Sequence, residues 1–160
     1  MKNTDQSLSL TRCCGDDPGF CALTAALDED LDARYGAQME FFGQYNHSAD
    51  VETALVARMD GALAGCGCFK PFSQDVVEVK RVFVPAAYRG RGVARAVLAE
   101  LEVWARELGH RAVVVETGVL QPEAIRLYET SGYERIANYP PYEGVKESIC
   151  FRKNLTESNE

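Results

Sequence analysis

Residues 89–94 read Arg-Gly-Arg-Gly-Val-Ala and lie between a strand-like segment, 76–84, and a segment typical of a long helix, 92–108. The two glycines allow the backbone to turn tightly and to bring its N–H groups close to a ligand. The helix that follows directs its positive end to the same place, and the arginine side chains suit phosphate oxygens. The stretch therefore predicts a cradle for a pyrophosphate group.

Other phosphate-binding loops fit this stretch less well. A Walker A motif ends in Gly-Lys followed by Ser or Thr, and the sequence contains none. The dinucleotide-binding pattern needs a third glycine three residues after the second, where this chain has Arg95. A glycine-rich surface turn with arginines but no ligand remains an alternative.

Strand and helix patterns extend outward from this stretch on both sides. Asp17 is a capping signal for a helix that Gly36 would end, and Asp60-Gly61 is typical of a type I′ hairpin turn. Residues 37–50 could form a short helix or a loop that lines a pocket. We expect helices over 18–35, 92–108 and 122–131, and strands over 7–13, 53–59, 62–69, 76–84, 112–116, 133–137 and 145–153.

Length and composition limit the classes of protein that the chain can be. The 160 residues suit one domain over 1–160, with a polar tail at 156–160 that we expect to be frayed. The net charge of −7 argues against a nucleic-acid partner. No segment reaches the roughly 18 apolar residues that cross a bilayer, and no secretory signal is visible, so we expect a cytoplasmic protein without a membrane partner. The spacing of the Cys and His residues favours buried, reduced thiols over disulfides or zinc, and we expect no metal.

Two motifs together resemble the GNAT superfamily of N-acetyltransferases, in its compact bacterial form. The segment Arg89-x-x-Gly92-x-Ala94 is similar to the family's acetyl-CoA signature, Gln/Arg-x-x-Gly-x-Gly/Ala. Residues 121–133, Gln-Pro-Glu-Ala-Ile-Arg-Leu-Tyr-Glu-Thr-Ser-Gly-Tyr, resemble a second motif, Asn-x-x-Ala-x-x-Leu-Tyr-x-x-x-Gly-Phe/Tyr. Glutamine at the first position departs from the usual asparagine. The resemblance extends over residues 7–153.

The resemblance implies an α/β (α+β) fold, with a mixed, mostly antiparallel central sheet of about seven strands flanked by about four helices. It implies acetyl-CoA as the acyl donor. In similar enzymes the strand before the turn splays from its neighbour and pairs with pantetheine through its main chain. The donor-binding residues would be Val82, Phe83, Val84, Arg89, Gly90, Arg91, Gly92, Val93, Ala94, Arg95, Gln121, Ala124 and Tyr128.

Attack of an amine on a thioester needs a base, donors for the developing oxyanion and an acid for the leaving thiolate. The resemblance makes Tyr128 the candidate acid, because a phenol is protonated at neutral pH. Glu78 is the candidate base and Glu116 the second candidate. The oxyanion donor would be a backbone N–H near Phe83 or Val84. A packed aromatic side chain, and a carboxylate that faces solvent or pairs with a neighbouring lysine, are the structural alternatives.

Acceptor recognition in the family implies a role for three segments of this chain, 27–45, 69–74 and 138–144. We expect a small-molecule amine as the acceptor, with a protein N-terminus or lysine as the alternative. A non-catalytic acyl-CoA-binding module and a nucleotide-binding protein are alternatives from other classes. The acidic run 28–32 could attract a cationic amine or be a solvated helix face. The family habit suggests a homodimer. Aromatic residues that could frame a pocket or belong to the core are Phe41, Phe42, Tyr45, Phe72, Tyr139 and Tyr142.

Overall fold

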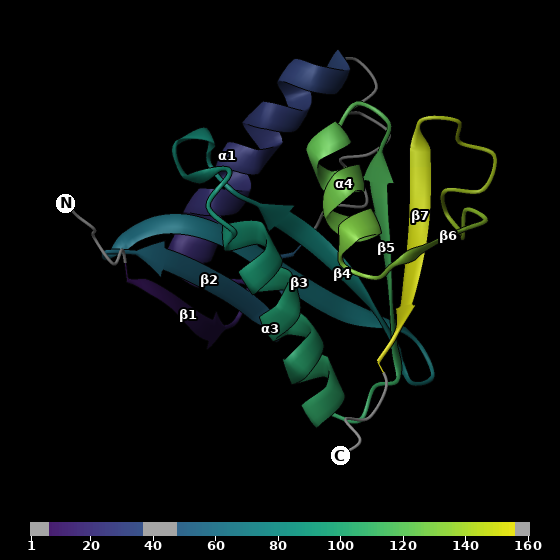
Figure 1. The fold of residues 1–160 in the computed structure, drawn as a ribbon, viewed down its shortest axis with the longest axis horizontal. Coiled ribbons are helices and arrows are strands. Elements are labelled where there is room, and N and C mark those ends of the chain that lie inside the picture. Colours follow the sequence, from purple (N-terminus) through teal and green to yellow (C-terminus); the bar gives the residue numbers. More distant parts are fainter. Residues whose placement is uncertain (1–6, 37–47, 156–160) are drawn as a thin grey trace. The chain divides into compact units, whose positions relative to one another are not determined.

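The computed structural model describes residues 7–36 and 48–155 (Figure 1). The strands form a seven-stranded sheet in the order β1-β2-β3-β4-β5-β7-β6. The β4–β5 pair is parallel, whereas β1–β2, β2–β3, β5–β7 and β6–β7 are antiparallel. This confirms the predicted mixed, mostly antiparallel sheet. The elements are β1 (Leu8–Cys13), α1 (Pro18–Tyr35), β2 (Ala54–Met59), β3 (Ala62–Ser73), β4 (Val76–Phe83), the 3-10 helix η2 (Ala86–Tyr88), α3 (Val93–Glu107), β5 (Ala112–Gly118), α4 (Pro122–Thr130), β6 (Glu134–Ile136) and β7 (Ser148–Asn154).

The helix count differs slightly from the expected four. Within the described ranges there are three α-helices and the short η2. The segment for which a helix or a loop was left open lies largely outside the described residues, together with Phe41, Phe42 and Tyr45. The tail at 156–160 also lies outside them.

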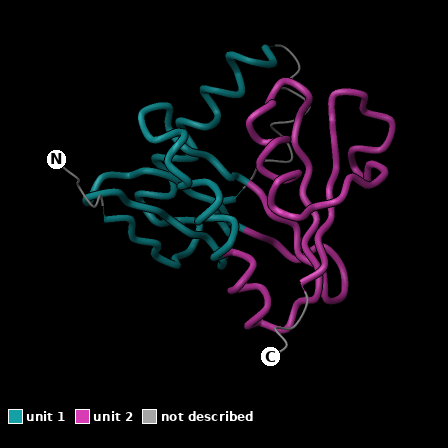
Figure 2. Tube along the Cα trace, viewed as in Figure 1, with its two compact units in different colours: residues 1–68, 81–100 teal, residues 69–80, 101–160 magenta. Residues whose placement is uncertain are grey.

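The chain forms two compact units, coloured separately in Figure 2. Unit 1 comprises Met1–Cys68 and Arg81–Glu100, and unit 2 comprises Phe69–Lys80 and Leu101–Glu160. The boundaries fall within β3, β4 and α3. Each unit is described by itself below, and a single domain over 1–160 stays a prediction.

Helix α1 of unit 1 has the predicted bounds because its signals are local. The Asp17 side chain accepts hydrogen bonds from the N–H groups of Gly19 and Phe20, at 2.9 and 3.1 Å, which satisfies two donors that no helical carbonyl can reach. The apolar stripe of α1 is buried against β2 and β3 in one core cluster. This cluster contains Phe20, Leu23, Leu27, Leu31, Val56, Cys66 and Cys68.

The β2–β3 hairpin confirms the turn prediction, since Asp60 and Gly61 both have positive φ, 52° and 88°, as a type I′ turn requires. Strand β3, however, is longer than expected and continues through Pro71 to Ser73. The predicted end of this strand at residue 69 was therefore wrong. A second tight turn, with Asp75 at a φ of 64°, connects β3 directly to β4 and leaves no room for a loop.

The last strand begins three residues later than predicted. Residues 145–147 belong to turns, in which the Val145 N–H donates to Tyr142 and the Ser148 N–H donates to Val145. The Asn138 side-chain amide also donates to the carbonyls of Tyr142, Val145 and Ser148. These hydrogen bonds occupy backbone groups that a strand would need, so β7 starts at Ser148.

The cysteine prediction holds in part. All six cysteines are free, but only Cys66, Cys68 and Cys150 are buried, whereas Cys14 and Cys21 are exposed. The described residues include no group of three or more His, Cys, Asp or Glu side chains placed to hold a metal ion. None of the helices in the described ranges combines the length and the apolar character that a membrane span needs.

Candidate active site

The predicted pyrophosphate cradle in unit 1 is an exposed turn that leads into α3. Gly90 and Gly92 have φ of 77° and 82°, a left-handed conformation that favours glycine. The first helical hydrogen bond runs from the Ala96 N–H to the Gly92 carbonyl, at 3.0 Å. The N–H groups of the first helical turn precede this bond and lie at the positive end of α3. This is the backbone arrangement that an anion requires.

The arginines of the turn are exposed at their positions but make protein contacts of their own. The Arg89 Nε donates to the Val84 carbonyl at 2.8 Å, and its guanidinium lies 5.8 Å from the Phe83 ring centroid. The Arg91 guanidinium lies 5.8 Å from the Tyr88 ring centroid. These contacts fasten the turn to the end of β4. Phosphate contacts of Arg89, Arg91 and Arg95 stay a prediction.

Gly65 on β3 is a residue that the sequence analysis missed. A Cβ at this position would lie 2.7 Å from Val93 Cγ1 and 3.3 Å from the Phe83 carbonyl oxygen. Because glycine has no side chain, the first residue of α3 can approach the strand closely and fix the start of the helix. An isolated glycine within a strand pattern is the signal that could have found it.

Glu78 on β4 of unit 2 is held by two neighbours. Its Oε2 accepts a hydrogen bond from the Tyr139 hydroxyl at 2.9 Å and lies 3.8 Å from Lys80 Nζ. Lys80 Nζ also lies 3.3 Å from the Tyr142 hydroxyl. Burial and the charge of Glu78 raise the pKa of Tyr139, so this phenol stays a donor to the carboxylate. The ion pair with lysine, which was the structural alternative to a catalytic role for Glu78, is thus present.

Glu116 on β5 of unit 2 has a different environment. Its Oε2 accepts a hydrogen bond from Ser148 Oγ on β7 at 2.7 Å. Burial raises the pKa of Glu116 to about 7, although the Ser148 hydrogen bond and Lys80 oppose the shift. The carboxyl group therefore titrates near neutral pH, where a general base is most effective.

Tyr128 on α4 is buried in unit 2 among aromatic rings. Its ring centroid lies 5.5 Å from that of Tyr133 and 5.7 Å from that of Phe151. Burial, with a smaller contribution from the charge of Glu116, raises the pKa of Tyr128, so the phenol is protonated across the neutral range. These ring contacts agree with the alternative that Tyr128 is a packed aromatic residue. The protonated phenol could also donate a proton. Its catalytic role stays a prediction.

The contacts that Gln121 and the main chain of residues 82–84 would make with acetyl-CoA also stay predictions. Gln121 Oε1 accepts a hydrogen bond from the Gly118 N–H at 3.3 Å, so the amide helps to close the turn after β5. The main-chain pairing predicted for residues 82–84 of unit 1 depends on the end of β4. The parallel register of β4 with β5 covers Val76–Val79 and Ala112–Val115, whereas β4 continues to Phe83.

The family model for acetyltransferases of the GNAT family matches residues 20–133. The chain belongs to the GNAT family. Like the family's other members, this GNAT enzyme is an acetyltransferase, and acetyl-CoA is the family's acyl donor. The matched range contains both motifs that carried the resemblance, and it covers α1 to the end of α4.

Known proteins resemble this GNAT enzyme over most of its length. An IAA acetyltransferase from Azospirillum brasilense is 36% identical over 137 residues, which cover 81% of this chain and 88% of that protein. The structure of a candidate acyl-CoA N-acyltransferase from Klebsiella pneumoniae has a TM-score of 0.78 and 29% identity, over 93% of this chain and 98% of that chain. The structure of yncA from Salmonella typhimurium, determined with acetyl-CoA, has a TM-score of 0.67 over 96% of this chain and 97% of that chain. At 18% identity, yncA shows the fold alone.

Proposed function

We propose that this GNAT acetyltransferase transfers the acetyl group of acetyl-CoA to a primary amine of a small molecule, by direct attack on the thioester. The observation that carries the proposal is the exposed turn at 89–92, where two left-handed glycines lead into the N-terminal end of α3. The name of the Azospirillum relative, an IAA acetyltransferase, supports the same activity.

Each part of the reaction is assigned to its own residues in this proposal. The amides of 91–95 bind the pyrophosphate, Arg89 supports the turn, and the main chain of 82–84 pairs with pantetheine. Gln121 and Ala124 contact the pantetheine arm, and Tyr128 is the acid, because a phenol is protonated at neutral pH.

The base is assigned to Glu116 rather than to Glu78. The Glu78 carboxylate already accepts a hydrogen bond from Tyr139 and has Lys80 beside it, so these two neighbours occupy it. Glu116 titrates near neutral pH and can take the proton of an ammonium ion. The neutral amine then attacks the thioester carbon, the C–S bond breaks, and the leaving sulfur takes the proton of Tyr128. The nitrogen of the new amide gives its extra proton to the Tyr128 phenolate, and Glu116 releases its proton to solvent.

Acetyl-CoA should raise the melting temperature of the purified protein, and ATP and NAD should not. A ligand that binds only the folded state stabilises it by about 2.7 kcal/mol at a hundredfold excess over its Kd. Differential scanning fluorimetry with acetyl-CoA, CoA, ATP and NAD in parallel measures the effect. A larger shift with ATP or NAD would contradict the proposal.

An amine screen then separates the remaining possibilities. Release of free thiol from acetyl-CoA with amino acids, polyamines or other small amines is the expected result. Turnover with peptides but not with small amines would indicate that the acceptor is a protein amine. Binding of acetyl-CoA without turnover on any amine would indicate a non-catalytic module.

Glu116→Gln should change the pH dependence of stability. The folded-state pKa of Glu116 lies above the ordinary value of 4.5, so the folded state binds the extra proton at low pH and loses this stabilisation as pH rises through about 7. Glutamine keeps the Ser148 hydrogen bond and removes the titration. The melting temperature of the variant, relative to wild type, should therefore rise between about pH 5 and about pH 8.

Glu116→Gln also tests whether Glu116 is the general base. Wild-type kcat/KM should rise with pH through about 7, and Glu116→Gln should lower it by about a hundredfold and remove this rise. Glu78→Gln is the matched control, because it replaces the other candidate base by the same amide. An unchanged pH profile in Glu116→Gln together with a lost profile in Glu78→Gln would reverse the assignment.

A further inference from the structure

Arg81 has a backbone conformation that is unusual within a strand. It lies in β4 with a φ of 63°, in the left-handed region that residues with a side chain rarely adopt. A single left-handed residue in a strand is typical of a bulge, which changes the direction of the groups that follow it. Because this conformation costs free energy, other contacts of the residue must stabilise it.

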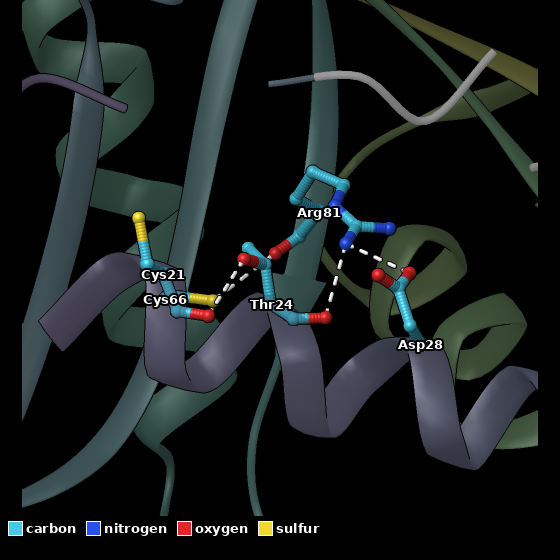
Figure 3. Close-up of polar contacts among 5 residues, drawn as sticks. All are labelled: Cys21, Thr24, Asp28, Cys66 and Arg81. Carbon is cyan, nitrogen blue, oxygen red and sulfur yellow. Dashed lines mark hydrogen bonds and ion pairs between the residues drawn. The ribbon is translucent and has the colours of Figure 1, made fainter. Parts of the chain in front are cut away.

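These contacts fasten Arg81 to two elements of unit 1 (Figure 3). Its Nη2 donates to the Thr24 carbonyl at 3.0 Å and to Asp28 Oδ1 at 2.9 Å, both on α1. Its carbonyl oxygen accepts a hydrogen bond from Cys66 Sγ on β3 at 3.3 Å. The Arg81 side chain is 4% exposed, whereas that of Asp28 is 53% exposed. The Arg81 side chain thus attaches residue 81 to α1, and the Cys66 thiol attaches its backbone to β3.

Stability does not explain an arginine at this position. Its Nε and Nη1 are buried and have no hydrogen-bond partner. Buried ion pairs often contribute nothing to stability, and an unsatisfied buried N–H group opposes folding. An apolar side chain of similar size would avoid both costs. The guanidinium is therefore best explained by the geometry that it imposes.

We propose that Arg81 is a positioning residue: its ion pair with Asp28 holds residue 81 left-handed and so directs the main-chain groups of 82–84. The proposal rests on the proposed function, which assigns these groups to pantetheine, and on the prediction that a backbone N–H near Phe83 or Val84 donates to the oxyanion. Misplacement of a reacting group by about 1 Å can lower a rate by about a hundredfold. Through the Arg81 side chain, helix α1 thereby fixes the geometry of β4, the strand that would bind the acyl donor.

The positioning role of Arg81 is tested by a matched pair of variants, Arg81→Ala and Arg81→Gly. Both remove the guanidinium, but only glycine adopts a positive φ without strain. We expect Arg81→Ala to lower kcat by about tenfold or more, and kcat of Arg81→Gly to exceed that of Arg81→Ala by about fivefold. The Kd of acetyl-CoA, which depends on the turn at 89–95, should change less than kcat in both variants. Asp28→Ala should lower kcat in the same direction, and it should also lower the melting temperature, because it leaves the buried Arg81 charge with one partner fewer.

Crystal structures of the two variants give a readout that needs no turnover. Residue 81 should keep a positive φ in Arg81→Gly and become extended in Arg81→Ala. A positive φ retained in Arg81→Ala would overturn the proposal, as would equal kcat losses in both variants. If wild-type protein does not bind acetyl-CoA, the proposed function fails, while the conformation of residue 81 in the variants still decides whether the ion pair holds the strand.

Discussion

Replacement of Tyr128 by phenylalanine should lower kcat by about a hundredfold and leave the melting temperature almost unchanged. The change removes only the phenol oxygen. Phenylalanine keeps the ring contacts with Tyr133 and Phe151, at centroid distances of 5.5 and 5.7 Å. A general acid contributes about 10²–10⁴ to a rate, so loss of the proton donor should appear in kcat and not in folding.

The Kd of acetyl-CoA shows whether the lower kcat of Tyr128→Phe reflects a lost proton donor or weaker binding of the acyl donor. Because phenylalanine keeps the aromatic ring at position 128, the Kd of acetyl-CoA should stay within about threefold of wild type. Isothermal titration calorimetry measures the Kd, and a thiol-release assay at saturating acetyl-CoA measures kcat.

Tyr133→Phe is the matched control for Tyr128→Phe. The Tyr133 hydroxyl donates to the buried carboxylate of Glu102 at 2.7 Å, and Lys153 Nζ lies 2.9 Å from the same side chain. Removal of this donor should lower stability by about 1–3 kcal/mol, because it leaves a buried charge with fewer partners, and should leave kcat unchanged. Equal kcat values for the two variants would show that Tyr128 is not the acid.

Elements with local signals could be predicted from the sequence. Asp17 caps α1 through bonds to residues two and three positions away, and the turn at 60–61 requires positive φ within two residues. Neither depends on a distant part of the chain. The same holds for the start of α3, where the pattern of glycines decides the backbone conformation. These elements were therefore predicted with correct bounds or within one residue.

Features that depend on distant contacts could not be predicted. The environments of Glu78 and Glu116 differ because their partners, Tyr139 and Ser148, lie 61 and 32 residues away along the chain. A sequence pattern places both glutamates on strands but does not show which one a tyrosine and a lysine stabilise. Arg81 likewise follows Lys80 in a strand pattern, and nothing in that pattern indicates a left-handed φ or a partner on α1.

Replacement of Gly92 by alanine should weaken acetyl-CoA binding by about tenfold or more. Gly92 has a φ of 82°, and an added Cβ would meet no atom within 4 Å. The substitution therefore introduces backbone strain and no steric clash. Strain in the left-handed region costs about 1–2 kcal/mol, and the turn can relieve it only by moving the first N–H groups of α3. Titration calorimetry with acetyl-CoA measures the change in Kd.

Gly61→Ala is the control that makes this result specific. Gly61 has a φ of 88°, also with nothing within 4 Å of an added Cβ, and it lies in the β2–β3 hairpin. Both variants should lose a similar amount of stability, because both place a side chain in the same backbone region. Only Gly92→Ala should lose acetyl-CoA affinity. Equal affinities in the two variants would leave the turn at 89–95 as a surface feature, whereas a selective loss would identify its backbone as the anion site.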